Sequence, residues 1–159
     1  MISGLSRPER GAIRWRGEDI RHLNEDYACQ LSYIGHAPAS KAELSVRENL
    51  VVSLALQGRQ PAAPEIDSAL RAAGLYARRD VAAGLLSQGQ RRRLALARLT
   101  LRPPTPLWIL DEPFNALDTP AREWLSGLIQ GHLRTGGIAI FTSHEQTGLE
   151  ALPQQVIAL

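Results

Sequence analysis

Apolar residues along the chain fall into short runs that predict strands. Residues Gly11 to Trp15 alternate apolar and polar side chains before a turn, and Leu31 to Ile34 is a second strand candidate. Leu107 to Leu110 and Ile138 to Phe141 are continuous apolar runs, of the kind that a parallel sheet buries on both faces. A short helix and a last strand at Gln155 to Leu159 are expected to finish the chain.

Helical periodicity is concentrated in the middle of the chain. Ser45 and Ser87 are each followed three residues later by a glutamate or a glutamine, which is the capping-box signature of a helix start. Between them the apolar pattern of Glu65 to Ala73 predicts another helix, which Gly74 closes. The helix that begins at Ser87 is expected to stop at the prolines at positions 103, 104 and 106. A helical block is therefore expected at about residues 45–101.

One more helix is predicted after the Leu107 strand. Thr119 is expected as its N-cap and Pro120 as its first residue, with an end near Gly136 and Gly137. The order of elements, strands first, then a helical block, then strand and helix in alternation, predicts an α/β fold that carries a helical insertion. The length of 159 residues fits a single domain over residues 1–159.

Composition narrows the class of protein. Hydrophobic residues make up 44% of the chain and charged residues 21%, as in ordinary globular proteins. No apolar run approaches the roughly 18 to 20 residues of a membrane span. The single cysteine, Cys29, forbids an intrachain disulfide, and the start of the chain lacks the apolar core of a signal peptide. These features predict a protein of the cytoplasm.

Arginine supplies 17 of the 18 basic residues, and its planar fork suits phosphate and carboxylate partners. The arginines are scattered among 16 acidic residues, and Arg91 to Arg93 is the only tight cluster. This cluster is expected to form the exposed face of the helix that follows Ser87. The scatter argues against nucleic acid as a partner.

The segment Leu86 to Gln90 can bind a phosphate. A helix N-terminus presents free N–H groups and the positive end of the helix dipole. The hydroxyl of Ser87 adds a polar contact, and Gly89 lets the backbone approach a ligand closely. Gln88 and Gln90 belong to the same turn. The alternative interpretation is a plain capping box with no ligand.

Asp111 and Glu112 follow a predicted buried strand, so their carboxylates lie at the carboxyl edge of the sheet, where α/β folds bind ligands. Two adjacent acids there are costly unless a cation or hydrogen bonds offset them. Asp111 is the candidate ligand of Mg²⁺, and Glu112 is the candidate that polarises an attacking water. The alternative is a solvated acidic turn before Pro113.

A lone histidine completes this set. His144 follows the Ile138 strand, which puts it on the same edge as Asp111, where it is expected to donate to a γ-phosphate. A structural histidine is the alternative. Asp118 stands in a tight turn before a helix and by itself reads equally well as a turn residue.

These motifs, in this order, resemble the nucleotide-binding subunits of ATP-binding cassette (ABC) transporters. The resemblance implies that Leu86 to Gln90 is the signature motif, Leu107 to Glu112 the Walker B strand, Ala116 to Asp118 the D-loop and His144 the switch histidine. It implies a P-loop NTPase-like nucleotide-binding domain with a helical subdomain at about residues 45–101, which uses ATP and Mg²⁺. In this family the helix at Ser87 contacts ATP held by a second subunit, so two such subunits form a dimer.

A finer resemblance rests on three segments. Where most of the family has a glutamine after the second strand, the segment Tyr33 to Pro38 has His36. With Lys41 to Leu50 and Pro106 to Phe114, it resembles the ATP-binding export proteins of cytochrome c biogenesis, a subfamily described as haem exporters. His36 then takes its place among the residues expected to contact the nucleotide.

The same subfamily implies partners and a location. Its members work with membrane-spanning transporter subunits, peripherally on the cytoplasmic face of the inner membrane, and nucleic acid is not among their partners. The region from His36 to Leu56 is expected to face the membrane subunit.

The Gly-rich phosphate loop (Walker A) of the family is missing from residues 1–159: the one lysine, Lys41, follows Ser40 and no glycine. Met1 to Gly11 resembles the stretch just after that loop, so the loop and the first strands are expected to precede Met1. The chain alone is then expected to bind Mg-ATP very weakly and to hydrolyse none. Alternatives are a truncated fragment of an ABC ATPase of another substrate class, or a non-catalytic subunit whose Ser87 completes a partner's site. A soluble ABC protein of ribosomes or DNA is disfavoured by the short chain.

Overall fold

The structure is a computed structural model, and it describes the chain except for residues 1, 7, 38, 102–104, 145, 146, 158 and 159. In chain order its strands and helices are β1 (Arg14–Trp15), β2 (Glu18–Asp19), α1 (Ile20–Cys29), β3 (Leu31–Ile34), α2 (Val46–Ala55), α3 (Ala63–Ala72), α4 (Gln88–Ala97), β4 (Leu107–Leu110), α5 (Thr119–Arg134) and β5 (Ile138–Phe141). Short 3-10 turns lie at Tyr76–Arg78, Ala83–Leu85 and Arg98–Thr100.

The central sheet is parallel and runs in the order β3-β4-β5. Its register aligns Ile34 with Leu110 and Leu110 with Phe141, so the three strands end side by side. The residues that follow them therefore meet at one edge. A separate antiparallel hairpin joins β1 to β2 before α1.

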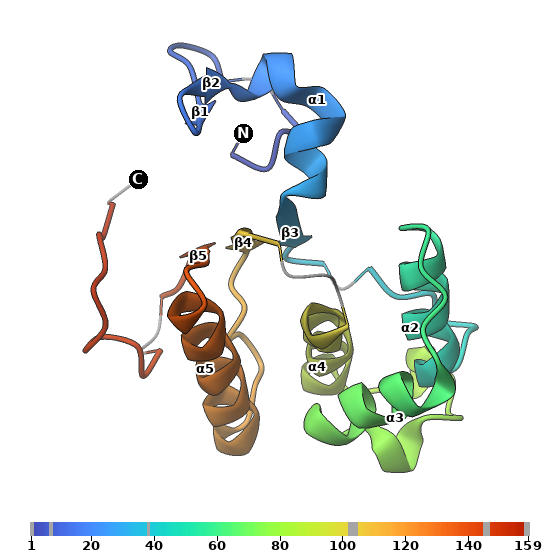
Figure 1. The fold of residues 1–159 in the computed structure, drawn as a ribbon. Helices are drawn as coiled ribbons and strands as arrows, with labels where there is room; N and C mark the ends of the chain where they lie inside the picture. The colour runs from blue at the N-terminus through green and yellow to red at the C-terminus, as the bar shows by residue number, and fades with distance from the viewer. Residues whose placement is uncertain (1, 7, 38, 102–104, 145–146, 158–159) are drawn as a thin grey trace.

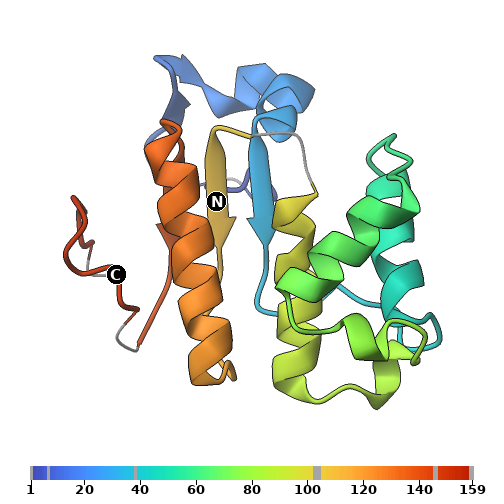
Figure 2. The same ribbon diagram turned by 60° about the horizontal axis from the view of Figure 1, so that its bottom comes forward.

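Helices α4 and α5 pack on one face of the sheet, and α1 with the hairpin lies on the other, as Figures 1 and 2 show. Successive side chains of a strand point to opposite faces of the sheet, so each strand contributes apolar side chains to both faces. Trp108 and Leu110 of β4 pack toward α4 and α5, whereas Leu107 packs with Ile20 and Tyr27 on the α1 side.

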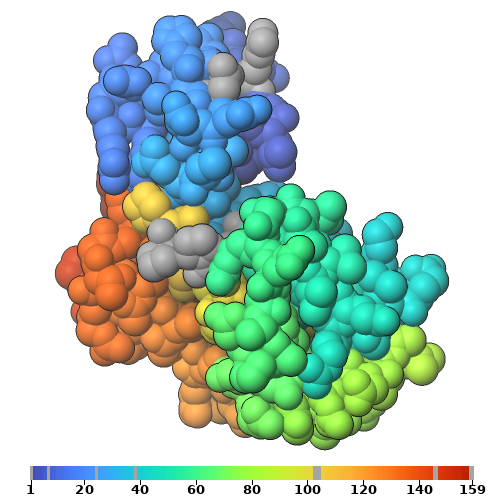
Figure 3. Space-filling view, turned by 45° about the vertical axis from the view of Figure 1, so that its right-hand side comes forward, coloured from blue at the N-terminus to red at the C-terminus, as the bar shows by residue number. Residues whose placement is uncertain are grey.

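The helical block has its own apolar cluster. Leu50 and Leu54 of α2, Leu70 of α3 and Leu94 of α4 are buried together there. In the space-filling view this block projects as a lobe beside α5 (Figure 3). Helix α4 belongs to both clusters, since Leu96 packs toward the sheet. It thus connects the helical block to the strands.

Both capping boxes predicted from the sequence are present. Ser45 Oγ accepts from the Glu48 amide at 3.2 Å, and the Glu48 carboxylate accepts from the Ser45 amide at 2.8 Å. The same exchange holds at the start of α4 between Ser87 and Gln90. Helices α2, α3 and α4 lie within the region of about residues 45–101 where a helical block was expected.

Two predicted features of the fold are wrong, and one helix was not predicted. Strand β5 is not buried on both faces: Ile138 and Ile140 are 49% and 38% exposed, because the apolar cluster on the α1 side includes side chains of β3 and β4 and not of β5. The N-cap of α5 is Asp118, not Thr119, so Pro120 is the second helical residue. Helix α1 was not predicted, although Ile20, Leu23 and Tyr27 recur at the helical spacing i, i+3, i+7 and Asp19 caps its first turn.

The end of the chain also differs from the prediction. Residues 147–157 contain neither a helix nor a strand. The rest of the predicted last strand, and the prolines at positions 103 and 104, lie outside the described residues. Among the described residues, no helix is both long enough and apolar enough to cross a membrane.

Candidate ATP-facing site

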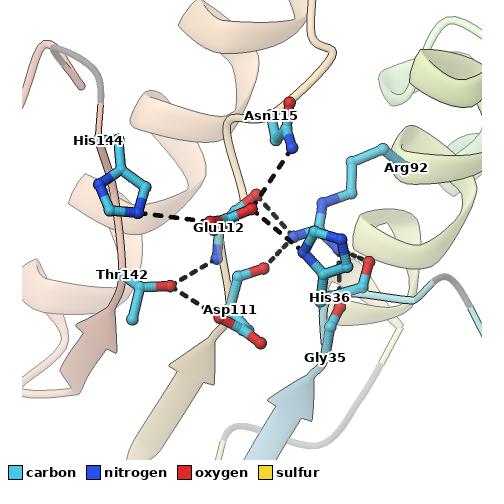
Figure 4. Close-up of polar contacts among 8 residues, drawn as sticks. All are labelled: Gly35, His36, Arg92, Asp111, Glu112, Asn115, Thr142 and His144. Carbon is cyan, nitrogen blue, oxygen red and sulfur yellow. Dashed lines mark hydrogen bonds and ion pairs between the residues drawn. The ribbon is translucent and has the colours of Figure 1, made fainter.

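The site lies at the carboxyl edge of the sheet, where three strands deliver polar residues side by side (Figure 4). Gly35 and His36 follow β3, Asp111 and Glu112 follow β4, and Thr142 follows β5. The ladder continues one residue past the strands, since the Asp111 amide donates to Ile34 O at 2.8 Å. This places the two carboxylates at the edge where the sequence predicted them.

Thr142 links the two acidic residues. Its hydroxyl donates to Asp111 Oδ1 at 2.8 Å and accepts from the Glu112 amide at 2.8 Å. One hydroxyl can do both, because it carries one proton and two lone pairs. Thr142 was not predicted from the sequence, although its place directly after β5, level with Asp111, was a signal for it.

The Glu112 carboxylate lies between two histidines. Its Oε2 is 3.1 Å from His36 Nδ1, and its Oε1 is 3.6 Å from His144 Nε2. Asn115 Nδ2 donates to Oε2 at 3.4 Å. Glu112 itself has a φ of 47°, a left-handed conformation that a non-glycine residue adopts at a cost. The backbone therefore turns sharply at Glu112, and its carboxylate lies among these three side chains.

The structure brings His36 and His144 to the same carboxylate from different strands, and both rings remain open to solvent, at 65% and 88% side-chain exposure. The expected neighbours of a γ-phosphate are thus assembled at one place. Their exposure means that the described residues leave this edge open to a ligand.

Arg92 contradicts the expectation that Arg91 to Arg93 form an exposed face. It is only 4% exposed, and its guanidinium donates to backbone carbonyls at the ends of β3 and β4. Helical spacing explains this, because Arg92, Ala95 and Leu96 lie on one face of α4, and that face packs on the sheet. The cluster's uniform charge concealed the periodicity.

Burial lowers the pKa of the Arg92 guanidinium, and the nearby charges of Asp111 and Glu112 act in the opposite direction. Arginine stays protonated under such shifts, because its ordinary pKa lies so high. A permanent positive charge therefore sits under the two carboxylates.

Gly89 belongs to the turn of residues Leu86 to Gln90, which we call the signature turn. A Cβ at Gly89 would collide with the carbonyl oxygen of Ala116 in the turn after β4. Ala116 has a φ of 59°, so this turn is itself tightly shaped. Ser87 Oγ and the Gln90 side chain are occupied by their capping box. Gly89 is thus required, within one chain, for close contact between the signature turn and the turn that contains Ala116.

Gln88 is the first residue of α4. With His36, Arg92 and Asn115 it lines a cavity of about 30 Å³, which has room for water but not for a nucleotide. Asp118 lies apart from this cavity as the N-cap of α5, where Oδ1 accepts from the Ala121 amide at 3.1 Å. The structure therefore gives Asp118 a structural role as a helix cap.

The side chains at this edge suit an Mg²⁺ ion that phosphate oxygens also bind. The described residues contain no group of three His, Cys, Asp or Glu side chains that could hold a metal by themselves. Mg²⁺ in nucleotide sites is held by one or two carboxylates together with phosphate oxygens and water. Asp111, fixed by Thr142, supplies a carboxylate of this kind.

The structure combines three features: a parallel sheet with adjacent carboxylates at its edge, a histidine beyond the next strand, and a capped turn that contains glycine. Together they define the class of ATP-binding proteins of transporters. The chain belongs to the ABC transporter family, whose sequence model matches residues 1–115. Among its relatives, the chain is similar to the cytochrome c biogenesis ATP-binding export protein CcmA of Methylococcus capsulatus, with 51% identity over 91% of the chain and 69% of that protein. It is also similar to CcmA of Dechloromonas aromatica, with 46% identity over 95% of the chain and 74% of that protein.

Solved structures support the same fold. The ATP-binding subunit of an ABC transporter superposes with a TM-score of 0.75 at 28% identity, covering 94% of this chain and 62% of that one. An ABC transporter ATP-binding protein from Pyrococcus furiosus gives 0.74 at 25% identity, covering 92% and 70%. The fold predicted from the sequence, an ABC nucleotide-binding domain with a helical region, is confirmed. The chain spans about three fifths to three quarters of these relatives.

Proposed function

We propose that the chain is an ATP-hydrolysing subunit of an ABC transporter complex that serves cytochrome c biogenesis and haem export. The main support for this proposal is the position of the Glu112 carboxylate, which lies between His36 and His144 and next to Asp111 at one edge of the sheet. The names of relatives at 46% and 51% identity supply the process.

The roles proposed for the residues follow from their chemistry. Mg²⁺, when bound with ATP, neutralises charge on the phosphate oxygens. Asp111 supplies its carboxylate to that ion. Glu112 accepts a hydrogen bond from the attacking water and orients it. His144 donates to the γ-phosphate, and His36 holds the Glu112 carboxylate from the opposite side.

The signature turn is proposed to act across a dimer. Ser87 to Gln90 opens α4, and its backbone N–H groups and helix dipole favour a phosphate held by a second subunit. The partners are then a second ATP-binding subunit and membrane-spanning subunits, with the chain at the cytoplasmic face of the inner membrane and no nucleic acid involved. Asp118 is proposed to contribute through the turn it ends and not by direct contact with nucleotide.

A second candidate function rests on one observation. Residues 1–159 contain no Gly-x-x-x-x-Gly-Lys-Ser/Thr sequence, so these residues alone supply no phosphate cradle. A chain of this kind is still able to complete a partner's ATP site through Ser87 to Gln90. In that case the chain is a non-catalytic partner subunit of an ABC ATPase.

The proposed role in cytochrome c biogenesis is tested in the organism that encodes the chain. Its coding sequence is replaced there with that of an Asp111→Asn variant. Loss of the Mg²⁺ ligand is expected to abolish haem-stained c-type cytochromes and to leave b-type haemoproteins unchanged. Glu123→Gln is the matched control, because Glu123 lies exposed on α5, and it is expected to have no effect. Normal c-type cytochromes in the Asp111→Asn cell would exclude the proposed catalytic role in this process.

A further inference from the structure

Arg92 reaches from the signature helix to the ends of two strands. Its Nη1 donates to Gly35 O at 2.7 Å and to His36 O at 3.3 Å, beyond β3. Its Nη2 donates to Glu112 O at 2.7 Å and also to Asp111 O, beyond β4 (Figure 4). One side chain of α4 thus contacts both strand ends that carry the site.

The choice of acceptors matters for the chemistry. Arg92 binds the backbone carbonyls of Asp111 and Glu112 and not their carboxylates. Its charge therefore offsets the two acids while their side-chain oxygens stay directed toward Thr142, His36 and His144. A carboxylate paired with a guanidinium would be a poorer ligand for Mg²⁺ and a poorer acceptor for water.

Burial makes this contact specific to arginine. A buried guanidinium is costly unless its donors are satisfied. Four carbonyls satisfy the two terminal nitrogens, whereas Arg92 Nε has no hydrogen-bond partner within the described part of the chain. A lysine ammonium is a point charge and cannot span both strand ends with a planar fork.

We propose that Arg92 is a positioning residue that ties the signature helix α4 to the strand ends carrying His36, Asp111 and Glu112. It fixes the distance between the turn that faces a partner's nucleotide and the carboxylates that act on the chain's own nucleotide. A movement of α4 is then transmitted to the Glu112 backbone. We call these contacts of Arg92 with the two strand ends the tie. The consequence for ATP turnover rests on the proposed function, but the existence of the tie does not.

The tie is tested without nucleotide, by amide hydrogen exchange of the 159-residue chain. In Arg92→Met, the amides of Asp111, Glu112 and Thr142 are expected to exchange roughly ten- to a hundredfold faster, the loss expected for hydrogen bonds to a charged group. The amides of α3 and α5 are expected to keep their rates. Arg91→Met is the matched control, with the same loss of charge at the neighbouring position on α4, and is expected to change none of these rates.

Arg92→Lys separates positioning from a general need for a buried cation. It is expected to restore only part of the protection, because an ammonium reaches fewer of the carbonyls. If Arg92→Met does not fold, a local loss in Arg92→Lys carries the test. Wild-type exchange in Arg92→Lys, or an equal acceleration at all amides in either variant, would overturn the proposal.

A kinetic readout links the tie to the reaction. In the ATPase purified with its bound subunits, Arg92→Lys is expected to lower kcat severalfold at an unchanged KM for ATP. A local exchange change with an unchanged kcat would overturn the catalytic consequence. If the wild-type assembly has no turnover, the proposed function fails, and the exchange result still decides the tie.

Discussion

Replacing Glu112 with glutamine is expected to lower kcat for ATP by about 10²- to 10⁴-fold, the usual contribution of a positioned general base. Glutamine keeps the size of the side chain and an oxygen that can accept from His36 or Asn115, so the site should keep its shape. KM for ATP should change little, because Glu112 acts on water and not on the bound nucleotide. The assay uses steady-state phosphate release by the chain purified with the subunits it binds in its own cell.

Glu123→Gln serves as the control for the same chemical change at an exposed position of α5. It should leave kcat and KM at wild-type values. A Glu112→Gln enzyme with normal kcat would show that another group orients the water, and the site assignment would then be wrong.

Replacing Gly89 with alanine is expected to destabilise the chain by about 1–3 kcal/mol, the usual cost of overpacking. The new methyl group would meet the carbonyl of Ala116, a backbone atom that cannot rotate away. This cost acts against the gain of about 1 kcal/mol that alanine normally brings to a helix interior. Chemical denaturation followed by circular dichroism measures the difference.

Gly127 provides the opposite case on α5. A Cβ at Gly127 meets nothing within 4 Å, so Gly127→Ala should stabilise the chain by about 0.5–1 kcal/mol. The two substitutions are chemically identical and are expected to differ in sign. Equal stabilisation by both would show that the signature turn and the Ala116 turn do not touch in solution.

The sequence predicted best those features that depend on neighbouring residues or on the place of a residue at the end of a strand. Both capping boxes follow from spacing alone, because a side chain three residues away satisfies the first amide of a helix. The proximity of Asp111, Glu112 and His144 could be predicted, because these residues follow parallel strands, which present their carboxyl ends at one edge of the sheet.

What the sequence did not reveal depends on contacts between distant segments. Arg92 looked like part of a charged surface, since its acceptors are carbonyls 19 to 57 residues away that no side-chain pattern encodes. Thr142 was missed for a related reason, because its partners Asp111 and Glu112 lie across the sheet. Gly89 was read as making room for a ligand, whereas the structure shows the Ala116 carbonyl in that place.

We propose that residues 1–159 carry the hydrolytic and signature residues of an ABC ATPase; their sequence contains no phosphate cradle. The most direct test is Mg-ATP hydrolysis, measured side by side for the 159-residue chain alone and for the assembly purified from its own cell. We expect no turnover above background for the chain alone, and turnover in the assembly that falls when Ser87 is changed to alanine. Turnover by the chain alone that Glu112→Gln abolishes would contradict this expectation.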